Sequence, residues 1–157
     1  MPDRCGGLVR RPGAQPLPGH HCGMMPAMPA PPPCPCGHPA AYADCCGRWH
    51  GGPLHLQAPD AEALMRSRYS AFVFELADYL LATWHASTRP RHVSFEPGQR
   101  WLGLQVRQHR RIDDHHATVE FIARSKQGGR AHRLHETSRF IREASCWFYV
   151  DGNLPTP

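Results

Sequence analysis

Long hydrophobic runs are missing from this 157-residue sequence. No stretch approaches the roughly 18 consecutive apolar residues of a membrane-spanning helix. Residues 1–33 also lack the apolar segment that follows the basic residues of a secretory signal. The sequence therefore predicts a soluble, cytoplasmic protein that does not interact with a membrane.

The sequence also has no block of like charge, no internal repeat and no recognisable catalytic motif. Its formal net charge of +5 is spread along the chain. This distribution indicates a soluble protein and is weak evidence for a nucleic-acid partner. A nucleophile motif, a glycine-rich phosphate loop and the spacing of a catalytic metal site are all absent. These absences favour a binding protein over an enzyme.

Proline and glycine number 17 and 14, and many of them lie near the N-terminus. This composition predicts a disordered tail rather than a packed core. Met24, Met25 and Met28 are alternative candidate starts, so residues 1–27 need not be part of the native protein. The predicted segments are a tail (1–33), a cysteine-rich motif (34–50), a linker (51–59), an α+β domain (60–152) and a short tail (153–157).

Four of the seven cysteines lie within thirteen residues, at Cys34, Cys36, Cys45 and Cys46. Four thiolates are a complete tetrahedral ligand set for zinc, with no open position for substrate, so the ion is expected to be structural. A disulfide between neighbouring cysteines would be strained, and a reducing compartment opposes it. Replacing Cys36 by serine is expected to release the metal and disorder residues 34–50, leaving the helices and the sheet intact.

The hydrophobic pattern changes along the second half of the chain. Asp60 is expected to cap a helix, and apolar residues then recur at helical spacing from Leu64 to Trp84, with a break near Glu75. Runs rich in aromatic and β-branched residues follow, and they are typical of strands; they cover residues 101–106, 118–124, 132–142 and 145–151. Short connections imply antiparallel pairing, so helices should pack on a curved antiparallel sheet.

The cysteine pattern C-x-C-G-x7-C-C resembles the SEC-C motif of bacterial proteins. The longer combination resembles the YchJ-like family, of uncharacterised function. It comprises residues 64–72 (LMRSRYSAF), 79–84 (YLLATW), 119–121 (VEF), 134–140 (LHETSRF) and 147–152 (WFYVDG). The resemblance implies a zinc-binding SEC-C knuckle followed by a nuclear-transport-factor-2-like, cystatin-like cone.

Such cones often bind small molecules at their wide mouth, and alternation along residues 132–142 indicates what would line one here. Leu134, Glu136, Ser138 and Phe140 share a face, so Glu136 is expected to point inward, with Arg66 or Arg68 as its charge partner. The pocket candidates are Arg66, Tyr69, Trp84, Glu136 and Ser138. A structural ion pair of Glu136 with arginine is favoured over a role as base or ligand anchor.

Three functions are compatible with these features. The favoured one is a non-catalytic adaptor that contacts a protein partner through the zinc motif. The second is a small-molecule-binding protein, or an isomerase- or dehydratase-type enzyme that uses Glu136 in the cone. The third is weak nucleic-acid or ribosome binding through Arg48, Trp49 and His50, which form a small footprint.

Overall fold

The structure is a computed structural model that describes residues 23 and 25–154. The described residues belong to two units, one that ends at Ala30 and one that begins at Pro31. The described part of the first unit forms no helix or strand. Most of the predicted N-terminal tail, and residues 155–157 of the predicted C-terminal tail, lie outside the described residues.

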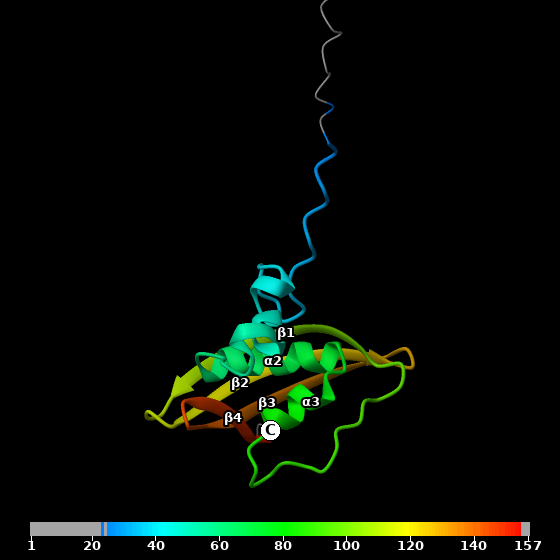
Figure 1. The fold of residues 1–157 in the computed structure, drawn as a ribbon. Helices are drawn as coiled ribbons and strands as arrows, with labels where there is room; N and C mark the ends of the chain where they lie inside the picture. Colours follow the sequence, from blue (N-terminus) through cyan, green and yellow to red (C-terminus); the bar gives the residue numbers. More distant parts are fainter. Residues whose placement is uncertain (1–22, 24, 155–157) are drawn as a thin grey trace, which may run out of the picture. The chain divides into compact units, whose positions relative to one another are not determined.

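The second unit begins with a compact cysteine-rich segment, drawn in cyan in Figure 1. Its elements are short: η1 (Tyr42–Asp44), α1 (Gly47–His50) and η2 (Gly52–Leu54). Gly37 has a φ of 90°, which a residue with a side chain rarely adopts and which turns the chain between the two cysteine pairs. The expected linker at 51–59 is partly structured, because η2 falls within it and Ala58 is buried.

Two helices follow, α2 (Ala61–Val73) and α3 (Ala77–Ala82). The predicted cap is present, since the backbone N–H of Ala63 donates to Oδ1 of Asp60 over 2.7 Å. The predicted break is also confirmed. It lies at Glu75, whose φ of 56° is incompatible with a continuing right-handed helix.

Four antiparallel strands complete the unit in the order β1-β2-β3-β4, with bounds Arg100–Arg111, His116–Gln127, Arg130–Glu143 and Cys146–Asn153. All four are longer than their predicted counterparts. Both helices lie over one face of the sheet (Figure 1). Register shifts interrupt the pairing of β1 with β2 and of β3 with β4, and such bulges increase the local bend and twist of a strand.

The core lies between α2, α3 and this face of the sheet, and it includes Leu64, Leu80, Val119 and Phe140, all fully buried. The four cysteines of the N-terminal segment belong to the same buried cluster. The predicted α+β class, with helices on an antiparallel sheet and an N-terminal cysteine cluster, is thereby confirmed. Among the described residues, no helix has the length and apolar character needed to cross a bilayer.

Candidate metal centre and cavity

Cys34, Cys36, Cys45 and Cys46 converge on one point, with their sulfur atoms all within 4.8 Å of one another. The Sγ atoms of Cys36 and Cys45 are 3.6 Å apart, and those of Cys45 and Cys46 are 4.0 Å apart. All four are buried free thiols rather than disulfides. The backbone turns at Cys45 and starts α1 after Cys46, which directs two adjacent side chains to the same centre.

The donor set fits a tetrahedral metal ion. Zinc–sulfur bonds of 2.3 Å in a tetrahedron place the sulfur atoms about 3.8 Å apart, close to the separations of 3.6 and 4.0 Å and below the upper limit of 4.8 Å for the whole set. Hydrogen bonding from Cys46 lowers the pKa of Cys36 to about 4 despite its burial, and the same bond raises the pKa of Cys46. The cluster therefore already favours one thiolate, the form that binds metal.

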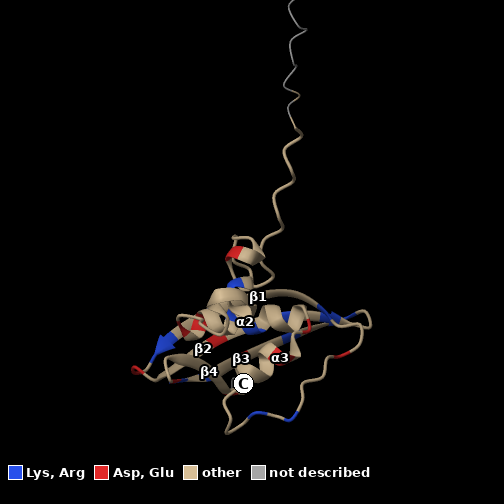
Figure 2. Cartoon of the chain, viewed as in Figure 1, with Lys and Arg blue, Asp and Glu red and all other residues tan. Residues whose placement is uncertain are grey.

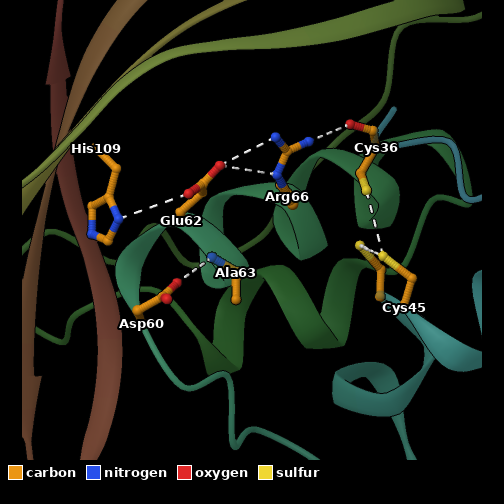
Figure 3. A network of polar contacts seen from close by, with 8 residues as sticks. Cys36, Cys45, Asp60, Glu62, Ala63, Arg66 and His109 are labelled. Carbon is orange, nitrogen blue, oxygen red and sulfur yellow. Dashed lines mark hydrogen bonds and ion pairs between the residues drawn. The ribbon is translucent and has the colours of Figure 1, made fainter. Parts of the chain in front are cut away.

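Polar contacts attach this cluster to α2. Nη1 of Arg66 donates to the carbonyl oxygen of Cys36 over 2.8 Å, and Oγ of Ser70 lies 3.6 Å from Sγ of Cys34. Figure 3 shows how Arg66 continues the link from Cys36 towards the sheet. Arg66 also pairs with Glu62 at 3.1 Å, and Nδ1 of His109 in β1 lies 3.8 Å from the second oxygen of Glu62. The cysteine cluster, α2 and the sheet are thus linked.

His50 connects the cysteine-rich segment to α2 a second time. Its Nε2 lies 2.7 Å from the carbonyl oxygen of Ser67 and its Nδ1 2.6 Å from the hydroxyl of Tyr42. A carbonyl only accepts, so Nε2 carries the proton and Tyr42 donates to Nδ1. Burial lowers the pKa of His50, which keeps it in this neutral form.

These contacts reduce the nucleic-acid surface expected at residues 48–50. Trp49 is buried and cannot offer its face to a base, and Arg48 packs over its ring with Cζ 4.6 Å from the centroid. His50 is directed inward to Ser67 and Tyr42. Only Arg48 of the three remains available for a contact with phosphate.

A cavity of about 340 Å³ lies between α2, the sheet and the segment that precedes β1. Its walls are mainly aromatic, formed by Tyr69, Phe72, Trp84, Phe95, Trp101, Phe121 and Tyr149. Its polar lining includes Arg68, Glu136 and Ser138, with Ser94, Glu96 and Gln99 from the preceding segment. Cavities of this kind, apolar with a few converging polar groups, are typical of small-molecule sites.

Glu136 points into this cavity from β3, as alternation predicts, but its partners differ from the expected arginines. Its Oε1 accepts from the hydroxyl of Ser138 at 2.8 Å and from that of Tyr149 at 3.4 Å. Burial raises the pKa of Tyr149 to about 12, so its hydroxyl stays protonated at neutral pH. The residue across from Ser138 in β4 is Gly152, and a Cβ there would overlap the carboxylate of Glu136.

Four of the five predicted pocket residues line the cavity, and one does not. Tyr69, Trp84, Glu136 and Ser138 line the cavity. Arg66 does not. It faces the cysteine cluster and Glu62, because it lies about 200° around the helix from Arg68 at 3.6 residues per turn.

His135 is directed to the opposite face of the sheet, where its Nε2 lies 2.8 Å from Oε1 of Glu120.

Sequence reasoning missed the segment 94–99 as part of the cavity, and it did not assign Tyr149 to the wall. The only signal for residues 94–99 is Phe95, an aromatic residue in a proline-containing loop. Tyr149 has a clearer signal. It shares its strand face with Trp147, which is buried.

Comparisons with known proteins agree with this architecture. The family model described as the YchJ middle NTF2-like domain matches residues 60–152. A UPF0225 protein of Bordetella pertussis is 62% identical over 124 residues, which cover 77% of this chain and 92% of the relative. A UPF0225 protein of Methylibium petroleiphilum is 62% identical over 129 residues, covering 82% and 93%.

Two solved structures are also similar. The solution structure of a SEC-C motif containing protein from Rhodopseudomonas palustris has a TM-score of 0.69 at 31% identity, covering 79% of this chain and 99% of the other. The crystal structure of a SEC-C motif containing protein from Psychrobacter arcticus has a TM-score of 0.65 at 28% identity, covering 80% and 84%. Taken with the relatives and the family model, these matches show that the chain belongs to the YchJ-like (UPF0225) family.

Proposed function

We propose that this protein binds a small molecule in its cavity and that a structural zinc ion holds the fold around it. The observation that carries the proposal is the cavity itself. Aromatic side chains line a space of about 340 Å³, and a carboxylate, a hydroxyl and a guanidinium line the same space.

The choice of zinc rests on the donors. Soft thiolates select zinc, copper(I) or iron–sulfur clusters, and four cysteines around one centre at tetrahedral spacing suit a single zinc ion. A closed set of four ligands leaves no position for substrate. The ion would therefore stabilise the segment without taking part in chemistry.

A protein partner for the zinc motif, the function favoured by the sequence, stays a prediction. The metal-binding side of the segment faces α2 through Arg66 and His50, so a partner would have to contact its outer side. A catalytic role for Glu136 as a general base also stays a prediction. Its carboxylate is within reach of a bound molecule, but two hydroxyls already donate to it.

The proposal is tested by titrating the zinc-loaded protein with neutral aromatic probes, phenol and phenylacetamide, and following backbone amide shifts by NMR. We expect saturable shifts confined to residues around the cavity. Ala123→Phe places a ring in the cavity, since Ala123 is buried in its wall, and should abolish these shifts.

Ala131→Phe is the matched control, because the same substitution there lies at an exposed position of β3 outside the cavity. It should leave probe binding unchanged. Shifts that persist in Ala123→Phe, or no saturable binding by the unaltered protein, would contradict the proposal.

A further inference from the structure

Arg68 is a buried cation in the wall of the cavity. Only 3% of its surface is exposed, and its Cζ lies 4.5 Å from the ring centroid of Tyr149 and 5.0 Å from that of Trp84. Burial lowers its pKa to about 10, which still leaves it charged at neutral pH. The two aromatic rings offer some stabilisation through cation–π contact.

The guanidinium of Arg68 is only partly satisfied. Nη1 donates to the carbonyl oxygen of Leu80 at 2.8 Å and to the hydroxyl of Thr83 at 2.7 Å. Among the described residues these are the only hydrogen bonds of Arg68, and no carboxylate forms an ion pair with it. Nη2 and Nε are not among the fully buried atoms without a partner, so both keep some contact with solvent. A guanidinium carries five N–H donors, so several remain free in a group that lines the cavity.

Neither carboxylate of the cavity forms an ion pair with Arg68, and Glu136 stabilises its charge only at longer range. Glu136 is engaged by Ser138 and Tyr149 instead, and Glu96 is exposed to solvent. Burying an unpaired charge is unfavourable unless something compensates it. The free donors of Arg68 form a fork whose geometry matches the two oxygens of a carboxylate.

From this geometry we infer that the natural ligand is a small organic acid whose carboxylate binds Arg68 and whose apolar or aromatic body fills the aromatic cavity. This inference rests on the proposed function. A hydroxyl or N–H group elsewhere on the ligand would reach Glu136, which can accept further hydrogen bonds. Arg68 thus sets the ligand's charge, and the rings of Tyr69, Phe72 and Trp101 hold its body.

The test compares three probes of one shape and different charge, phenylacetate, phenylacetamide and phenethylammonium. Binding is measured by calorimetry and by the fluorescence of Trp84 and Trp101, which line the cavity. We expect phenylacetate to bind at least tenfold more tightly than phenylacetamide and phenethylammonium to bind most weakly. In Arg68→Gln the ratio of the first two affinities should fall to near one.

Arg66→Gln is the matched control, since it removes the same charge from the same helix but on the side that faces Cys36. It should retain the preference for phenylacetate. The three probes are also compared on the unaltered protein, so the preference for a carboxylate is tested even if Arg68→Gln fails to fold. If phenylacetamide or phenethylammonium binds as tightly as phenylacetate, the preference for an acid is wrong, but binding in the cavity stands. If no probe binds, the acid preference and the proposed function are both wrong.

Discussion

Gly152 in β4 lies against the carboxylate of Glu136 in β3, and this contact determines where the acid can sit. The carboxylate occupies the space that a Cβ would fill and so comes within reach of the hydroxyls of Ser138 and Tyr149. The absence of a side chain at residue 152 is therefore a condition for the polar arrangement in the cavity.

Gly152→Ala should lower the free energy of unfolding by about 1.5–3 kcal/mol, the range for a hydrogen bond to a charged group. Replacing a glycine in a strand by alanine ordinarily stabilises the protein. A lower free energy of unfolding would therefore identify displacement of the Glu136 carboxylate as the cause. Urea unfolding measures the change. Gly51→Ala is the control, because Gly51 is extended and its Cβ would meet nothing within 4 Å; equal stability of the two variants would contradict the explanation.

At the scale of elements, the outer face of the sheet brings together positive charges that are scattered in the sequence. Arg124 lies directly opposite Arg133, and Arg100 opposite Lys126, and all four are exposed. Figure 2 shows Lys and Arg where β2 and β3 approach their connecting turn. Like charges in directly opposed positions destabilise an antiparallel pair.

Arg133→Glu should therefore stabilise the protein by about 0.2–1 kcal/mol, because it converts the pair with Arg124 into one of opposite charge. The gain should shrink as salt is added, since the side chains are exposed. Thermal unfolding at low and high salt measures both effects. Arg130→Glu introduces the same change opposite Gln127 and should give no comparable gain; a gain as large there would assign the effect to net charge alone.

On the scale of the folded unit Pro31–Pro157, the cysteine cluster and the sheet share a single core. Cys36 and Cys46 are as completely buried as Leu64 and Phe140, and Arg66 and His50 connect the cluster to α2. The expectation that loss of a ligand would disorder residues 34–50 alone therefore needs revision. Removing the metal should loosen the support of α2 as well.

Elemental analysis of the reduced protein should find one zinc per chain, and chelation should lower the midpoint of one cooperative thermal transition that covers helices and sheet. Binding of structural zinc contributes about 10 kcal/mol or more in short peptides, so the shift should be large. Cys45→Ser with Cys46→Ser should lose the metal, whereas Cys146→Ser, outside the cluster, should keep it. A separate early transition of residues 34–50, with the main transition unmoved, would contradict the shared core.

Several features could be predicted from the sequence because they depend on neighbours along the chain. The cap at Asp60 and the cysteine cluster within thirteen residues are local, and the inward direction of Glu136 follows from strand alternation between Leu134 and Phe140. Each requires only that the correct element forms.

The charge partner of the cavity depended on the tertiary structure. Helix α2 buries residues nearly all around its axis, including Leu64, Ser67 and Arg68, because the sheet packs on one side and the cysteine-rich segment on the other. Its hydrophobic pattern therefore does not show which side faces the cavity. Arg66 and Arg68 look equivalent in the sequence, and only the packing of two distant segments against α2 directs one to the cysteine cluster and the other to the cavity.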